Sequence, residues 1–80
     1  MDDQDLIARI NELSRDEHEL WGRESRGEAS LEEQERLKAL GVTLDQCWDL
    51  LHQRRARRAA GLDPNEATVR DASTVEGYQG

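Results

Sequence analysis

The segment from Leu37 to Arg58 constrains the fold of this chain more than any other part of the sequence. It reads LKALGVTLDQCWDLLHQRRARR, and its large apolar residues recur mostly three or four positions apart. That spacing lines one face of an α-helix, because each residue turns the helix by about 100°. The apolar positions are Leu37, Leu40, Leu44, Cys47, Trp48 and Leu51. The chain is therefore predicted to be helical and to pack this face against another surface.

A second apolar stripe precedes this segment and is wider than a single two-helix seam requires. Its members are Leu6, Ile7, Ile10, Leu13, Leu20 and Trp21. The stripe stops in the GRESRGEA segment at residues 22–29, where two glycines favour the end of a helix. The pattern predicts a first helix over about residues 3–25, with Gly27 in the turn that follows.

Start and stop signals define the second helix. Ser30 and Glu33 match a capping box, in which each side chain accepts a hydrogen bond from a backbone N–H that the first turn leaves free. Gly61 is suited to the left-handed conformation that often ends a helix. These signals predict a helix over about residues 31–60, which contains one unfavourable residue, Gly41.

The short connection predicts that the two helices are antiparallel neighbours, with residue i beside about residue 56 − i. Apolar residues then face each other along the seam, and Glu17, which interrupts the first stripe, falls opposite Leu40 and Gly41. Glu17 either packs its stem and reaches the edge, or is a polar residue that fixes the register or binds a ligand. The predicted fold is all-α, a coiled-coil-like antiparallel hairpin over residues 1–61 with a short capped turn.

Self-association is expected because a chain of 80 residues has a marginal core of its own. The width of the first stripe and the two tryptophans indicate a second apolar interface. Two hairpins packed as a four-helix bundle with twofold symmetry satisfy both features. We predict a homodimer whose interface includes Ile7, Ile10, Trp21 and Trp48.

The tail over residues 62–80 carries one further helix signal. Asp63 can cap, Pro64 suits the first helical position, and Glu66 can complete a capping box, which predicts a short helix at residues 64–68. The remaining residues are polar with isolated apolar side chains, Val69, Val75 and Tyr78. We expect most of the tail to be disordered, or to pack only on a partner.

The net charge of −7 argues against a protein that coats nucleic acid or an anionic membrane, because both tasks need surplus positive charge. Residues 1–35 are acidic, residues 36–60 are basic and residues 61–80 are acidic. No apolar run approaches the length of a signal peptide or membrane span, so a cytoplasmic location is expected. The single cysteine, Cys47, lies on the apolar stripe and is expected to act as a small buried hydrophobe.

The arginine run at the end of the second helix is the predicted binding surface, and it contains Arg54, Arg55, Arg57 and Arg58. In the antiparallel register, Asp2 and Asp3 arrive beside Arg54 and Arg55 and can neutralise them. Arg57 and Arg58 are expected to project beyond the first helix, free to pair with phosphate or carboxylate groups. Arginines in this position are also what the helix dipole favours.

Catalytic and metal-binding patterns are weak. Asp49 and His52 have the spacing of a Glu-x-x-His pair in di-metal bundles, but the residue three before His18 is Arg15, and the two histidines fall far apart along the hairpin. Cys47 has no assigned base, and no nucleophile elbow or glycine-rich phosphate loop occurs. We therefore expect a non-enzyme with no metal site and no cofactor.

Three stretches together carry a family resemblance: Ile10 to Leu20, the LDQCWDLLHQRRARR run from Leu44 to Arg58, and GLDPNEATVR from Gly61 to Arg70. This combination resembles a family of short, mainly actinobacterial proteins known as domain of unknown function 2630. The resemblance covers nearly the whole chain and implies a small helical protein without an established activity. A fainter, architectural likeness is to the helical-hairpin anti-sigma factors.

Two functions follow from these observations as hypotheses. The first is a non-enzymatic protein–protein interaction or regulatory module, a dimeric hairpin that engages an unknown protein through its acidic face or its arginine end. The alternative is a sensor that binds a nucleotide or another phosphate through the arginine run. Binding to nucleic acid is not expected, because acidic segments flank the basic one.

Overall fold

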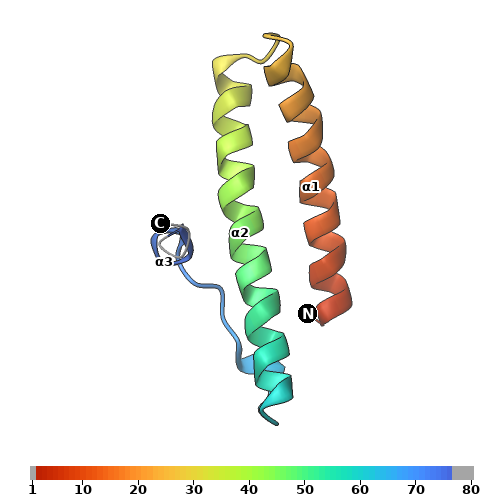
Figure 1. Cartoon of the computed structure of the whole chain (residues 1–80), viewed down its shortest axis with the longest axis vertical. Coiled ribbons are helices and arrows are strands. Elements are labelled where there is room, and N and C mark those ends of the chain that lie inside the picture. Colours follow the sequence, from red (N-terminus) through yellow and green to blue (C-terminus); the bar gives the residue numbers. More distant parts are fainter. Residues whose placement is uncertain (1, 77–80) are drawn as a thin grey trace.

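The computed structural model describes residues 2–76 and is all-α. Helix α1 (Asp3–Ser25) and helix α2 (Leu31–Ala59) lie side by side and antiparallel, as Figure 1 shows. A 3-10 turn, η1 (Pro64–Glu66), and a short helix, α3 (Ala72–Glu76), follow. The predicted antiparallel helical hairpin is confirmed.

Side-chain caps begin both long helices. The Asp5 backbone N–H donates to Asp2 Oδ1 at 2.8 Å, and the Asp2 N–H donates to Asp5 Oδ2 at 3.2 Å, so α1 starts with its own capping box. At α2 the predicted capping box is present, with 3.1 Å from Glu33 N to Ser30 Oγ and 3.2 Å from Ser30 N to Glu33 Oε1. These bonds fix where each helix begins, because they satisfy N–H groups that lack a partner within the helix.

Glycine ends both long helices in the same way. Gly27 and Gly61 have φ angles of 70° and 75°, in the left-handed region that glycine adopts without a steric penalty. The following N–H reaches back to the last turn, from Glu28 to the Arg23 carbonyl at 2.9 Å and from Leu62 to the Arg57 carbonyl at 2.8 Å. Both ends are therefore Schellman motifs, and they direct the chain away from the helix axis.

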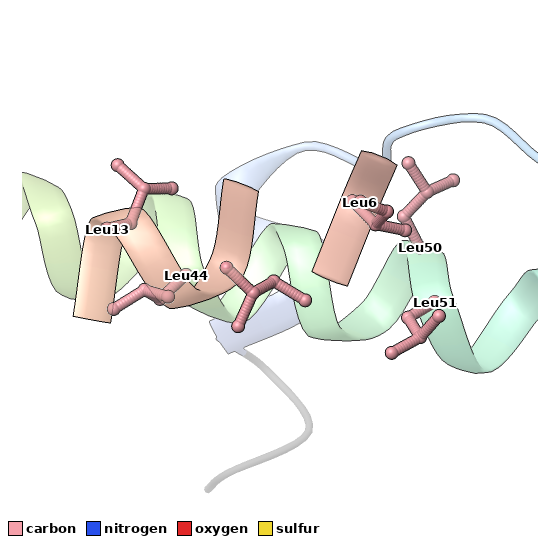
Figure 2. Close-up of a cluster of buried hydrophobic side chains, with 6 residues drawn as sticks. Leu6, Leu13, Leu44, Leu50 and Leu51 are labelled. Atoms are coloured by element: carbon pink, nitrogen blue, oxygen red, sulfur yellow. The ribbon is translucent and has the colours of Figure 1, made fainter. Parts of the chain in front are cut away.

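Leucine and isoleucine side chains fill the seam between the helices. Figure 2 shows Leu6 and Leu13 of α1 with Leu44, Leu50 and Leu51 of α2, and Ile10 completes this buried cluster. Leu51 is fully buried. A Cβ at position 41 would lie 3.5 Å from Glu17 Oε2, so the predicted position of Glu17 opposite Gly41 is confirmed.

The tail differs from the prediction that it is mostly disordered. It runs back along α2, which lies between α1 and α3 (Figure 1). The Gln53 side-chain amide donates to the Thr68 carbonyl at 2.9 Å, the Gln46 amide donates to the Arg70 carbonyl at 3.1 Å, and Val75 is buried. Amide side chains on α2 thus satisfy tail backbone groups that would otherwise need water.

The short tail helix predicted at residues 64–68 is a 3-10 turn of three residues. Asp63 caps it as expected, accepting a hydrogen bond from the Asn65 N–H at 2.9 Å. Glu66 does not complete a capping box, because its carboxylate pairs with Arg57 instead. The disorder expected at residues 77–80, including Tyr78, lies outside the described residues.

Candidate functional site

The arginine end is built around Arg54, whose side chain is buried between α1 and the tail. Its Nε donates to Asp3 Oδ1 at 2.7 Å, and its Nη1 lies 3.3 Å from the Pro64 carbonyl and 3.2 Å from Asn65 Oδ1. One guanidinium therefore joins α1, α2 and η1. The fork of donors on arginine suits this arrangement, since a lysine offers no such planar geometry.

Asp3 is shared between two arginines. Arg58 Nη1 donates to Asp3 Oδ2 at 2.8 Å, while Arg54 holds the other carboxylate oxygen. The bond to Arg58, followed by the bond to Arg54, lowers the pKa of Asp3 to about 2. The predicted contact between Asp3 and Arg54 is therefore confirmed, but the second arginine is Arg58 rather than Arg55.

The expectation that Arg57 and Arg58 are free is wrong. Arg58 pairs with Asp3, and Arg57 donates from Nε to the Asp63 carbonyl and from Nη2 to Glu66 Oε2, both at 2.7 Å. The physical reason is that the tail folds back along α2 and brings its acceptors to these arginines. Arg55 is exposed and has no hydrogen bond or ion pair with the residues that the structure describes.

A second candidate surface lies on one side of the hairpin and contains both tryptophans. Trp21 is 56% exposed and Trp48 is 45% exposed. Trp48 follows Gly41 by seven residues, so both lie on the same side of α2. Trp21 also reaches this side, because it lines a hollow of about 490 Å³ there. This hollow, the Gly41 hollow, is lined by Trp21, Leu37, Lys38, Gly41, Val42, Asp45 and Glu76.

The strip that contains the tryptophans is poor in charge. Between residues 7 and 21 of α1 and between residues 37 and 52 of α2, helical rotation gives it nine members: Ile7, Asn11, Ser14, His18, Trp21, Leu37, Gly41, Trp48 and His52. We call these residues the tryptophan face. None of the nine carries an acidic or basic side chain other than histidine, in a chain whose residues are 36% charged. Charged residues border the face, with Asp3 and Arg55 at one end and Lys38 and Asp45 beside the hollow. The ring centroids of Trp48 and His52 lie 6.3 Å apart.

The residues predicted to form an oligomer interface differ in their exposure. Trp21 and Trp48 are exposed, and Ile7 is half-buried against the edge of the core. Ile10 is only 2% exposed and packs in the hairpin core, so its inclusion in an oligomer interface is wrong. The middle of the wide first stripe faces α2, and one flank alone remains on the surface.

Cys47 lies on the other side of the hairpin. It is half-buried, packs against the core as expected, and has a pKa raised by burial. It lines a mostly apolar groove of about 200 Å³ together with Leu6, Arg9, Thr43, Gln46, Leu50 and Val69. Burial of this kind favours the thiol over the reactive thiolate.

The histidine and carboxylate patterns do not converge. Asp49 accepts a hydrogen bond from Gln53 at 2.8 Å and pairs with Arg70 at 3.2 Å, so its carboxylate is held toward the tail. Within residues 2–76, no three His, Cys, Asp or Glu side chains form a group that could hold a metal ion. In the same part of the chain, none of the helices is long and apolar enough to span a membrane.

Part of the tryptophan side was not predicted from the sequence. Lys38, Val42, Asp45 and Glu76 line the Gly41 hollow, and none was singled out. Gly41 was the one sequence signal for the hollow, because a glycine beside an apolar stripe leaves space where a side chain would stand. Nothing in the sequence pattern indicated that α3 would bring Glu76 there.

Comparison with known proteins places the chain in a family. A family model described as "Protein of unknown function (DUF2630)" matches residues 2–80. The chain belongs to the DUF2630 family. The resemblance found in the sequence is thus confirmed.

Proteins similar to this chain occur in mycobacteria. They include the uncharacterized proteins Rv0898c of Mycobacterium tuberculosis (strain H37Rv) and Mb0922c of Mycobacterium bovis. Each is 48% identical over 79 residues, which cover 98% of this chain and 91% of the relative. No solved structure gives a significant match.

Proposed function

We propose that this protein is a non-enzymatic interaction module that self-associates through the tryptophan face, as a homodimer with a four-helix core. The observation that carries the proposal is the exposure of both tryptophans on a strip whose middle part has no acidic or basic side chains other than histidine. Aromatic enrichment with depletion of charge marks the centre of protein interfaces. Exposed tryptophans scattered over a charged surface would carry less weight.

The exposed tryptophan area is large enough to matter for association. If a tryptophan spans about 250 Å², the exposed fractions leave about 250 Å² of tryptophan surface on each copy. Burial of that area in two copies is worth on the order of 12 kcal/mol, which falls within the range of the 4–15 kcal/mol that association costs. The remaining apolar contacts of the face would then favour the dimer.

The arginine end gives less support to the alternative of a phosphate sensor. Arg54 and Arg58 already hold the Asp3 carboxylate, and Arg57 holds Glu66. A phosphate ligand would have to displace carboxylates whose pairing the fold itself maintains. We therefore assign the arginine end to the stability of the hairpin.

Sedimentation velocity over a range of protein concentrations tests the proposed function. We expect the intact chain to dimerise and Trp48→Ala to weaken the dimer at least tenfold, because a buried interface tryptophan commonly contributes about 2 kcal/mol or more. Leu31→Ala is the matched control, since Leu31 is 77% exposed but lies in the first turn of α2, outside the tryptophan face.

Circular dichroism of both variants verifies that the helices remain. A monomer at 100 µM would contradict self-association. An equal loss of the dimer in Leu31→Ala and Trp48→Ala would show that the tryptophan face has no special part in it.

A further inference from the structure

The tryptophan face carries a protruding group and a hollow at different heights along the hairpin. The antiparallel register sets these heights, because Arg23 pairs with Glu33 at one end and Asp3 pairs with Arg54 at the other. Trp48 is therefore level with about residue 8 of α1. The Gly41 hollow, which Trp21 lines from α1, is level with about residues 11–21 of α1.

A twofold axis can bring these two features together. Consider an axis that lies in the plane of the interface and is perpendicular to the helices. It places α2 of one copy over α2 of the other and turns the second copy end over end, so that positions along the hairpin run in opposite directions in the two copies. If the axis crosses α1 at about residue 12, a group level with residue 8 in one copy faces a feature level with about residue 16 in the other. Trp48 of each copy would meet the Gly41 hollow of the other, and the two contacts would be equivalent.

The chemistry of the hollow suits an indole ring. Leu37, Val42 and Trp21 offer apolar and aromatic contacts, and Gly41 has no side chain to fill the space. Asp45 and Glu76 lie on the rim and interact with each other. Carboxyl oxygens can accept more than one hydrogen bond, and an indole N–H seeks an acceptor when it is buried. Because Glu76 belongs to α3, the folded tail completes one wall of the hollow.

We propose that two copies pair about this axis, with Trp48 of each inserted in the Gly41 hollow of the other. The inference rests on the proposed function and adds the arrangement of the dimer. A twofold axis parallel to the helices is the competing arrangement. It would place Trp48 over Ile7 of the second copy, and no Trp48 side chain would then enter the Gly41 hollow.

Cross-linking through introduced cysteines separates the two arrangements. Ser14 is exposed, lies on the face and falls within about two residues of the axis, so Ser14→Cys should lie close to the same position of the second copy. Ser25 is exposed on the same side of α1 but lies at its end, far from the axis, and Ser25→Cys is the matched control. Both variants carry Cys47→Ser.

With a short bismaleimide, Ser14→Cys should form covalent dimers and Ser25→Cys should remain monomeric on a denaturing gel. An uncross-linked Ser14→Cys in a protein that still sediments as a dimer would overturn the arrangement and leave the proposed function standing. A protein that sediments as a monomer would instead overturn the proposed function itself.

A second variant tests the hollow directly. Gly41→Leu places a side chain in part of it. The added Cβ makes only an ordinary contact with the flexible Glu17 carboxylate, so we expect the hairpin to tolerate the change. We expect at least a tenfold weaker dimer with unchanged helical circular dichroism. Ala39→Leu adds the same side chain on an exposed position of α2 outside the tryptophan face and should dimerise normally. Unchanged dimerisation of Gly41→Leu would overturn the inference.

Discussion

The arginine end and the tryptophan face are the two surfaces that the sequence offers for binding, and the fold treats them differently. At the arginine end, Arg54, Arg57 and Arg58 all find carboxylates within the same chain. On the tryptophan face, Trp21 and Trp48 keep about half of their surface exposed. The charges of the arginine end are therefore paired within the chain, whereas the tryptophan face stays exposed.

The difference reflects how charged and apolar groups are satisfied. A long arginine side chain needs only one well-placed carboxylate, and a chain with acidic segments on both sides of its basic one supplies several. An indole ring is stabilised mainly by the burial of its apolar surface, and a hairpin has a single seam in which to bury it. In a small helical protein, a cluster of charges is therefore a weaker indication of a binding surface than an apolar flank beside the seam.

Replacement of Arg54 should have the largest effect and would test whether the arginine end is structural. Arg54→Met keeps the apolar stem but removes three hydrogen bonds, so we expect it to lower the unfolding free energy by about 2 kcal/mol. Arg55→Met is the matched control, because the neighbouring side chain is exposed, and its effect should stay within about 0.5 kcal/mol. Urea unfolding at one protein concentration measures both. Equal effects would remove the distinction between the two arginines.

The pH dependence of stability sharpens the same point. Asp3 has a pKa of about 2 in the fold, below its ordinary 3.8, so its ion pairs stabilise the protein fully above about pH 4. That contribution is lost as the pH falls through about 2. The melting temperature of the intact chain should exceed that of Asp3→Asn at pH 7, and the gap should close between pH 4 and pH 2. A gap that does not depend on pH would show that the Asp3 charge is not what stabilises this end.

Most of the hairpin could be predicted because its determinants are local. The Ser30 and Glu33 capping box and the glycines at 27 and 61 act on adjacent backbone groups, so the sequence carries their signal directly. The register followed from the turn and was precise enough to place Glu17 opposite Gly41. Helix ends and pairing in such a hairpin are properties of short stretches of sequence.

The tail and the detailed surfaces could not be predicted in the same way. Gln46 and Gln53 hold the tail through its backbone carbonyls, a contact that needs no particular tail sequence and leaves no periodic pattern. Because the tail folds back along α2, Arg57 pairs with Glu66 instead of remaining free. Ile10 and Trp21 belong to one apolar stripe in the sequence, and only the position of α2 shows which of them is buried.

Gly41→Ala should have the smallest effect and tests why a glycine interrupts α2. A Cβ at this position would be in ordinary contact with Glu17, so packing within the hairpin does not require glycine. Alanine favours a helix over glycine by about 1 kcal/mol, so the substitution should raise the unfolding free energy of the monomer by about 0.5–1 kcal/mol. Urea unfolding of dilute protein, at a concentration where sedimentation shows the monomer, measures this gain without the dimer. A lower unfolding free energy of the Gly41→Ala monomer would mean that the hairpin itself requires a glycine at this position. The hollow on the tryptophan face would then be explained by the packing of the monomer rather than by a second copy.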